Sequence, residues 1–512
     1  MADGGAPMIS PVQGDPVVPE GERLLRGQGR FLDDLRFAGE LFAAFLRSPL
    51  PHARILGIDG TAAAALPGVA AVLTAAELEA DGVRPIRPYV VAQGADGRPA
   101  HAPPLGILAR DRVRYVGEPV VLVLAETRAT ALDALDAIAV EYEALPAVVD
   151  PALAEQGPEI WPDAPGNLSY RWAAGAAEAT AAAFAAAARV VELDLVNQRV
   201  SALPLEPRGA IAVPSQAGMT LHTGAQMPLA LRRVLADAVL GGAEDRLRVV
   251  VPDMGGGFGL KGPAFPEQAA VLWAARRLGR PVRWQAERGE GLLSDTGSRD
   301  TVSRIALALD GENRITALRL SVRANLGACV IGHGSTVPLG GMGLVTGAYR
   351  IPTYHAELRA VFTNMAPTDA YRGAGRPEVI YALERAMDAA ARAIGEDPAR
   401  FRERHLVPAA AMPYTLPTGL RFDVGDFASC LAGAREAIGW DRAAERRAEA
   451  AARGRLYGRG MAMFVDRTGG GGEEWSRVEA LADGRFVAAF GTQSSGQGHA
   501  AAYSRLLAER LQ

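Results

Sequence analysis

The chain has 512 residues, which is too long for one ordinary hydrophobic core and predicts two to four domains. A hydrophobic content of 49% and a charged content of 22% are typical of a soluble globular protein, and the net charge of −4 gives no electrostatic reason to expect nucleic acid or an anionic membrane as partner. The two cysteines, Cys329 and Cys430, can build neither a disulfide scaffold nor an iron–sulfur site on their own.

The first unit expected along the chain covers residues 21–150, after a Gly- and Pro-rich flexible tail over residues 1–20. The start MADGGAPMIS has no basic region followed by an apolar core, so we expect no signal peptide, no membrane span and a cytoplasmic location. Turn residues separate short predicted strands in ELFAAFLRS, ARILGID and GVAAVLT. RYVGEPVVLVLAET predicts a strand pair, and ATALDALDAIAVEYEAL predicts a helix running into a strand. Residues 150–167 form a candidate linker.

A second unit is expected over residues 165–415, and a third over residues 424–512. The second alternates strands such as VVELDLV, GAIAVP, RLRVVVP and SRIALALD with the helices MPLALRRVLADAVLG, PEQAAVLWAARRLG and PEVIYALERAMDAAARAIG. The third begins with the helix ASCLAGAREAIG and continues with strands in GRGMAMFVD, SRVEALAD and RFVAAFGT. The chain stops inside the helical pattern HAAAYSRLLAERLQ without a Gly or Asn cap, so we expect the third unit to be incomplete.

Three glycine-rich loops each precede a predicted helix: DMGGGFGLKG (253–262), DAYRGAGRPE (369–378) and GTQSSGQGH (491–499). Backbone N–H groups at the positive end of a helix can bind anionic oxygens. The first loop also contains G-x-G-x-x-G, with Glu287 as a possible ribose-binding acid, so a nicotinamide- or flavin-dependent dehydrogenase is one alternative. A large anionic cofactor that contacts all three loops is the alternative that uses every loop.

Protein ligands for a metal are not evident in the sequence. The seven histidines form no H-x-x-H, no H-E-x-x-H and no pair with a cysteine. If a metal is present, an organic ligand must therefore hold it. Lys261 precedes Gly262 and no Ser or Thr follows, so a Walker loop is excluded.

The three loops, together with LEPRGA and TGAQMPLALRR, stand in an order that resembles the large, molybdenum-cofactor-binding subunit of the xanthine dehydrogenase / aldehyde oxidase / aerobic carbon monoxide dehydrogenase family. GQGRFLDDLRFAGELFAAFLRSPLPHARI and YVGEPVVLVLAET resemble that family's N-terminal a/b hammerhead domain. The implied fold class is α+β: a hammerhead domain over 21–150, followed by a first (165–415) and an incomplete second (424–512) molybdopterin-binding domain.

The resemblance also implies site residues. Gln226 would place its side-chain amide close to the oxygen ligands of the metal, and the backbone of Arg372 would approach one of them, so these two are the implied catalytic residues. The implied cofactor-binding residues are Gln226, Gly257, Phe258, Gly259, Arg372, Gly496, Gln497 and Gly498. Tyr371 and Ala374 would border the substrate pocket, and the small side chain of Ala374 suggests room for a bulky substrate. The pterin dithiolene, and no protein side chain, would hold the metal.

The implied reaction is oxidative hydroxylation of an aldehyde or an N-heterocyclic carbon, with water as the oxygen source. The implied cofactor is molybdenum–molybdopterin in its cytosine dinucleotide form, and electrons would pass to a 2Fe-2S small subunit and an FAD-binding medium subunit in a dimer of heterotrimers. The family's general-base glutamate lies beyond the position of Gln512 in a longer subunit, so this chain alone is expected to be inactive, and a non-catalytic fragment is the remaining alternative.

Two glycines argue against particular substrates. Gly373 stands where copper-containing carbon monoxide oxidisers carry a cysteine, and Gly262 stands where purine oxidisers carry a carboxylate. The resemblance therefore implies that neither carbon monoxide nor xanthine is the substrate.

Overall fold

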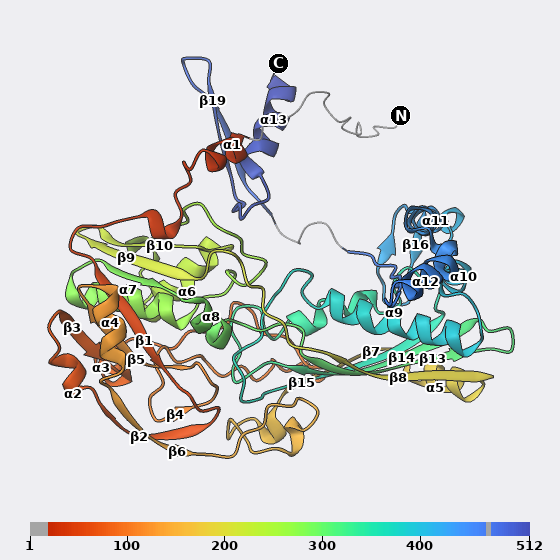
Figure 1. The fold of residues 1–512 in the computed structure, drawn as a ribbon, viewed down its shortest axis with the longest axis horizontal. Coiled ribbons are helices and arrows are strands. Elements are labelled where there is room, and N and C mark those ends of the chain that lie inside the picture. Colours follow the sequence, from red (N-terminus) through yellow and green to blue (C-terminus); the bar gives the residue numbers. More distant parts are fainter. Residues whose placement is uncertain (1–18, 467–472, 512) are drawn as a thin grey trace.

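The computed structural model describes residues 19–466 and 473–511, which fold around two large β-sheets with smaller sheets beside them (Figure 1). The expected tail over residues 1–20 lies almost entirely outside the described residues. The strands are β1 (Leu41–Arg47), β2 (Ala53–Asp59), β3 (Val69–Leu73), β4 (Arg112–Val113), β5 (Pro119–Ala125), β6 (Ala139–Ala144), β7 (Leu168–Gly175), β8 (Arg189–Asn197), β9 (Gly209–Ser215), β10 (Gly218–Thr223), β11 (Leu247–Val250), β12 (Val282–Gln285), β13 (Thr301–Leu309), β14 (Ile315–Asn325), β15 (Thr353–Val361), β16 (Tyr414–Thr415), β17 (Arg421–Phe422), β18 (Ser476–Ala480) and β19 (Phe486–Phe490). The α-helices are α1 (Pro19–Leu25), α2 (Thr61–Ala64), α3 (Ala75–Ala80), α4 (Arg128–Leu135), α5 (Ala177–Ala185), α6 (Pro228–Leu240), α7 (Pro266–Leu278), α8 (Arg288–Ser294), α9 (Arg376–Ala393), α10 (Pro398–His405), α11 (Phe427–Ile438), α12 (Ala443–Ala452) and α13 (His499–Leu511).

A seven-stranded sheet is shared between the first and second expected units. Its order is β11-β10-β9-β12-β1-β5-β3, so three strands of the first unit continue directly from four strands of the second. The junction is a parallel pairing in which Leu41 and Phe42 of β1 lie opposite Val282 and Arg283 of β12. The apolar run of β5 is buried over its whole length, as expected for a strand covered on both faces.

The strand pair predicted in RYVGEPVVLVLAET is not a pair. β4 joins β2 and β6 in a separate three-stranded sheet, whereas β5 lies between β1 and β3. The turn at Val116–Glu118 carries the chain from one sheet to the other, which strand propensity alone does not reveal.

The second large sheet has the order β7-β15-β14-β13-β8, and α9 packs along it (Figure 1). Apolar residues of α9, such as Leu383 and Met387, are fully buried in the core of this sheet. The expected linker belongs to the same core: Ile160 is fully buried, and the Asn167 side chain donates to the carbonyl of Ala154 at 2.9 Å. This segment is therefore packed.

The third expected unit does not pack as one body. Leu431 of α11, together with Met461 and Met463, belongs to the core of the second unit. The strand predicted in GRGMAMFVD is absent from residues 458–466, where the chain runs without a β-ladder. It is held instead by the side chains of Arg402 and Glu384, which bond the Met461 carbonyl and the Met463 N–H. β18, β19 and α13, which follow residues 467–472, form a small unit beside α1 (Figure 1).

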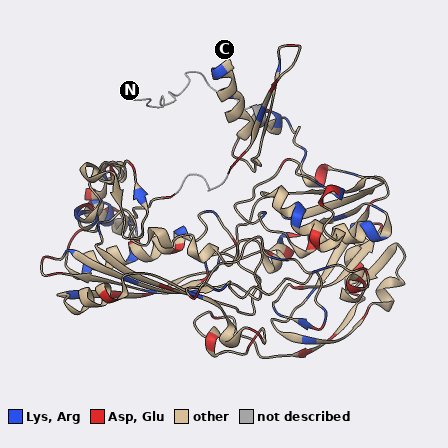
Figure 2. Cartoon of the chain, turned by 180° about the vertical axis from the view of Figure 1, so that it is seen from behind, with Lys and Arg blue, Asp and Glu red and all other residues tan. Residues whose placement is uncertain are grey.

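A buried network of ion pairs joins β1 to α7. The guanidinium groups of Arg47 and Arg208 both pair with the Glu267 carboxylate, at 2.7 and 2.8 Å. Arg47 also pairs with Glu290 at 2.6 Å, and Arg208 with Asp295 at 2.6 Å. Elsewhere acidic and basic residues are interspersed along the elements (Figure 2). Within the described residues no helix combines the length and apolar character needed to cross a bilayer.

Candidate cofactor-binding site

Three of the segments singled out in the sequence meet where the two large sheets adjoin. TGAQMP follows β10, DMGGGFGLKG follows β11, and DAYRGAGRPE leads from the region after β15 into α9. β10 and β11 are parallel neighbours, so their carboxyl ends lie at the same edge of the seven-stranded sheet. The third of these loops approaches from the five-stranded sheet.

Gln226 lies directly against the first glycine loop. Its side-chain Oε1 accepts the N–H of Gly259 at 2.8 Å, and its own backbone N–H donates to the Lys261 carbonyl at 2.8 Å. A Cβ at Gly257 would lie 2.5 Å from the Gln226 side chain, so only glycine permits this approach. Within the described residues the Nε2 amino group of Gln226 has no acceptor, so it remains available as a donor.

The first loop adopts the left-handed backbone conformation at Gly256 (φ 97°), Phe258 (φ 54°) and Gly259 (φ 102°). A Cβ at Gly259 would stand 2.2 Å from the Ala370 carbonyl oxygen. This contact, and the bond from the Arg372 N–H to the Phe258 carbonyl at 2.9 Å, join the first loop to the second.

The same loop presents consecutive backbone donors. The N–H groups of Gly256, Gly257 and Phe258 have no acceptor within the described parts of the chain. Successive N–H groups in alternating backbone conformations form concave sites for anionic atoms.

Arg299 holds the second loop and was missed in the sequence. Its guanidinium donates to the carbonyls of Tyr371 at 3.2 Å and Arg372 at 2.8 Å, and it lies 4.9 Å from the centroid of the Tyr371 ring. Glu378, at 3.3 Å, supplies the opposite charge. Arg299 is some 70 residues from the loop and belongs to no motif, so no local pattern could have found it.

Lys261 is occupied by a buried ion pair. Its ammonium lies 2.6 Å from the Glu206 carboxylate, which also accepts the N–H groups of Gly255 at 2.9 Å and Leu32 at 3.4 Å. Burial lowers the pKa of Lys261, and the charge of Glu206 opposes this effect. Lys261 therefore stabilises the loop and does not face a ligand.

The third glycine loop lies beside the start of the first. Gly496 and Gly498 line a pocket of about 670 Å³ together with Asp253 and Met254. His222 also lines it, and the buried Nδ1 of His222 has no partner among the described residues. Gln497 is exposed, and its side-chain oxygen accepts a hydrogen bond from the Ser495 N–H.

The donor set fits a large anionic ligand rich in heteroatoms. Three kinds of polar group here have no hydrogen-bond partner among the described residues: the amide donors of the first loop, the amino group of Gln226 and the Nδ1 of His222. A bound ligand would supply these partners. A pterin nucleotide has such groups along its whole length.

The same geometry does not fit a dinucleotide fold. β11 and β12 flank α7 in sequence, but β10 and β9 separate them in the sheet, so no parallel βαβ unit of neighbouring strands exists here. Glu287, the proposed ribose-binding acid, is exposed and pairs with Arg128 at 3.0 Å.

Comparison with known protein families agrees with this arrangement. The model of the aldehyde oxidase and xanthine dehydrogenase a/b hammerhead domain matches residues 26–146, and models of molybdopterin cofactor-binding domains match residues 160–406 and 433–512.

The chain belongs to the aldehyde oxidase and xanthine dehydrogenase family.

Family relatives resemble the chain over nearly its whole length. It is 35% identical to the gamma subunit of the 6-hydroxypseudooxynicotine dehydrogenase complex and 34% identical to the nicotine 6-hydroxylase large subunit, both from Paenarthrobacter nicotinovorans. These alignments cover 96% of this chain but 62% and 61% of the relatives. The crystal structure of quinoline 2-oxidoreductase from Pseudomonas putida 86 is 34% identical, with a TM-score of 0.88, over 94% of this chain and 62% of that one. The chain thus spans less than two thirds of the length of these relatives.

The matches confirm the predicted family, the fold class and the molybdopterin-binding domains. The individual residue roles stay predictions. The structure places Gln226, Gly257, Phe258, Gly259, Arg372, Tyr371 and Ala374 together, and it places Gly496 and Gly498 beside the start of the same loop.

Proposed function

We propose that this chain is the cofactor-binding part of the large subunit of a molybdenum hydroxylase. The convergence of Gln226 with the first two glycine loops carries the proposal, since these three separate segments bond to one another and leave N–H donors of Gln226 and the first loop free in one region. Because the chain spans about 62% of its relatives, the activity belongs to the complete subunit in its complex.

The residues divide between two ends of the cofactor. Gln226, Gly257, Phe258, Gly259 and Arg372 would hold the metal end, and Gly496, Gln497 and Gly498 would hold the pterin. When bound, the cofactor supplies the two-electron redox centre. Gln226 would donate a hydrogen bond from its free amino group, with the Gly259 N–H fixing its orientation. The Arg372 N–H already donates to Phe258, so any contact with a cofactor oxygen would share this group.

The proposed substrate is an N-heterocycle or an aldehyde. Nicotine and quinoline, after which two relatives are named, are both N-heterocycles, which favours that class. Tyr371 and Ala374 would border the pocket. Gly262 provides no carboxylate for a purine, and Gly373 provides no thiolate for copper.

The proposed assembly is a dimer of heterotrimers in the cytoplasm. A 2Fe-2S small subunit and an FAD-binding medium subunit would accept the electrons, because two cysteines cannot bind a cluster in this chain. The name of one relative, a gamma subunit of a dehydrogenase complex, supports a multi-subunit enzyme. The proposed form of the cofactor is the cytosine dinucleotide.

The test uses the complete subunit in its purified complex, with quinoline and benzaldehyde as probe substrates in ¹⁸O-labelled water. We expect about one molybdenum atom per protomer, and turnover that transfers ¹⁸O to the product. Gln226→Ala should retain molybdenum but lower kcat about 100-fold, the usual effect of losing one placed donor. Gln216→Ala, in the exposed turn between β9 and β10, is the matched control and should behave as wild type. Molybdenum below about a tenth of an atom per protomer, or full activity of Gln226→Ala, would overturn the proposal.

A further inference from the structure

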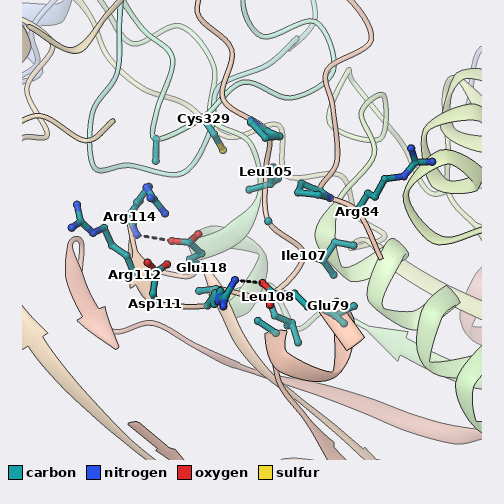
Figure 3. A pocket seen from close by; sticks show the side chains of 18 of the residues that line it. Glu79, Arg84, Leu105, Ile107, Leu108, Asp111, Arg112, Arg114, Glu118 and Cys329 are labelled. Atoms are coloured by element: carbon teal, nitrogen blue, oxygen red, sulfur yellow. Dashed lines mark hydrogen bonds and ion pairs between the residues drawn. The ribbon is translucent and has the colours of Figure 1, made fainter. Parts of the chain in front are cut away.

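A second pocket, of about 270 Å³, lies between the hammerhead domain and the first molybdopterin-binding domain (Figure 3). α3 and residues 104–118 of the hammerhead domain form most of it, and Trp161, Ala328 and Cys329 close it from the other domain. None of its lining residues belongs to the glycine loops or contacts Gln226. It is therefore a separate site.

Arg114 brings an unsatisfied cation into this pocket. Its guanidinium stacks on the Trp161 ring at 3.8 Å, while the backbone N–H of the same residue donates to the Glu118 carboxylate at 2.5 Å. No hydrogen bond or ion pair joins the guanidinium to an acceptor in the described chain, and its buried Nε has no partner. The residue is only partly buried, so the unmet requirement falls on Nε, and a buried N–H donor without an acceptor is unfavourable.

The other arginines around the pocket differ in whether they have an acidic partner. Arg110 pairs with Glu79 and Arg84 pairs with Asp237, each at 2.7 Å, so these two arginines are already neutralised at the rim. Arg112, which lines the same pocket, has no side-chain partner among the described residues. Arg112 and Arg114 therefore both bring guanidinium groups without a carboxylate partner to this pocket.

Burial lowers the pKa of the Arg114 guanidinium, and the charges of Glu118 and of Asp111, which also lines the pocket, oppose this effect. Glu118 acts on the guanidinium without pairing with it. It forms no ion pair with either arginine in the described structure, and it is 6% exposed. Burial raises its pKa to about 7, so near neutral pH the carboxyl is partly protonated and can donate to an anionic ligand. Figure 3 shows Glu118, Arg112 and Arg114 on one side of the pocket.

The opposite side of the pocket is apolar. Leu105, Ile107 and Leu108 line it (Figure 3). Cys329 lies nearer to Glu118 and Arg114, and burial raises the pKa of its thiol, which therefore stays protonated. A small inorganic anion would leave this surface without a contact. The volume lies just below the usual range of ~300–1,000 Å³ for small-molecule pockets, so a compact ligand is required.

We propose that this pocket binds a small organic carboxylate with an apolar or aromatic body, whose carboxylate pairs with Arg114 and Arg112 and whose body lies against Leu105, Ile107 and Leu108. Planar carboxylates match the fork of an arginine, and the pairing removes the unsatisfied charge. A bound ligand would touch both domains and stabilise their contact. The inference does not depend on the proposed reaction.

Titration calorimetry on the full-length complex tests the ligand class with benzoate, benzamide and inorganic phosphate as probes. We expect benzoate to bind at one site per protomer in this pocket, with benzamide and phosphate at least about 10-fold weaker. Arg114→Met should weaken benzoate at least about 10-fold, whereas Arg84→Met, whose wild-type side chain is paired at the rim, should not. Equal affinity for benzamide, equal affinity of the Arg114→Met complex, or no benzoate binding would overturn the proposal.

A second variant and a crystal structure guard against misfolding and against binding elsewhere. Leu108→Trp fills the apolar half while leaving both arginines in place, and it should also abolish binding in this pocket. In crystals soaked with 4-bromobenzoate, the anomalous bromine peak should lie beside Leu105 and Leu108. A peak only near Tyr371 and Ala374 would overturn this inference and leave the proposed function untouched. A complex that lacks molybdenum but shows the peak beside Leu105 and Leu108 would overturn the proposed function and support this inference.

Discussion

At the scale of single residues, the second glycine loop starts from a buried acid. Asp369 is 1% exposed and accepts the N–H groups of Ala370 at 2.6 Å and His333 at 3.2 Å. Burial raises its pKa from 3.8 to about 7, and the two N–H groups only partly oppose this effect. The loop that carries Tyr371 and Arg372 thus begins at a carboxyl group that titrates near neutrality.

Asp369→Asn should change how stability depends on pH. Because the folded pKa lies above the unfolded value, Asp369 contributes most favourably below about pH 4, and this contribution is lost as pH rises toward about 7. The loss amounts to about 4 kcal/mol. The variant should therefore gain in Tm relative to wild type between pH 5 and pH 8, as measured by calorimetry of the purified complex. Asp423→Asn, at an exposed position, is the control, and a Tm difference that does not vary with pH would contradict the assignment.

Gly259 is the residue at which the two loops touch. With φ at 102° and a Cβ position 2.2 Å from the Ala370 carbonyl, Gly259→Ala should lower the free energy of unfolding by at least about 2 kcal/mol. Molybdenum content should fall with it, because Gln226 bonds the same residue. Gly311→Ala is the matched control, since a Cβ there meets nothing within 4 Å. Wild-type stability of Gly259→Ala, measured by thermal unfolding, would show that the loop can relax.

The sequence predicted these loop residues but not the side chains that hold them. Gly257 and Gly259 stand out because closely spaced glycines can be recognised directly in the sequence. Arg299 does not, because it acts across a long sequence separation on two carbonyl groups. Glu206 belongs to the LEPRGA motif, but the motif did not reveal that its carboxylate would accept the Gly255 N–H. Such contacts leave no periodicity and no spacing from which to infer them.

At the scale of elements, the local sequence pattern predicted where α7 lies in the chain but not how deeply it is buried. Its position after the first loop was predicted, and Pro266 begins it as expected for a first helical turn. The pattern did not reveal that residues from Pro266 to Ala275 are buried on every side, including the charged Glu267. A helix enclosed on all faces loses the amphipathic signal that would mark its contacts.

Glu267→Gln tests the ion-pair network of this helix. The charges of Arg208 and Arg47 outweigh burial and hold the pKa of Glu267 at about 2, below the unfolded value of 4.5. Its contribution is therefore fully present above about pH 4.5 and is lost as pH falls toward 2, a loss of about 3 kcal/mol. Glu267→Gln should be destabilised by about that amount near pH 7 and should lose less stability on acidification.

Chemical denaturation between pH 3 and pH 7 measures both effects. Glu312→Gln, on the surface beside Arg314, serves as the control because exposed ion pairs contribute little. If Glu267→Gln and wild type lose stability in parallel on acidification, the network does not hold the carboxylate in its charged form.

At the scale of the whole molecule, the two domains that the family models separate are joined by one β-ladder. The sequence predicted a boundary between two domains at residues 150–167, and the two family models also meet there, between residues 146 and 160. The pairing of β1 with β12 joins residues about 240 positions apart, so no local signal could predict it.

Cooperative unfolding should follow from this shared sheet. Hydrogen exchange followed by mass spectrometry on the intact complex should show β1, β5, β9 and β12 losing protection together, with one slow rate. The unit formed by β18, β19 and α13 lies beyond residues 467–472 and serves as the internal comparison, with its own rate expected. Earlier exchange of β1 and β5 than of β9 and β12 would show that the hammerhead domain opens independently.

The same ladder limits how this lineage can be recombined. A chimera made by cutting between residues 146 and 160 would exchange what looks like a self-contained module. It would also replace one side of the strand pairing at Leu41–Val282, and with Arg47 one of the two arginine partners of Glu267. Grafts should succeed only when the donor preserves that register and the arginine at position 47. The part that must be exchanged as a whole is the seven-stranded sheet, although the boundary between the family models cuts across it.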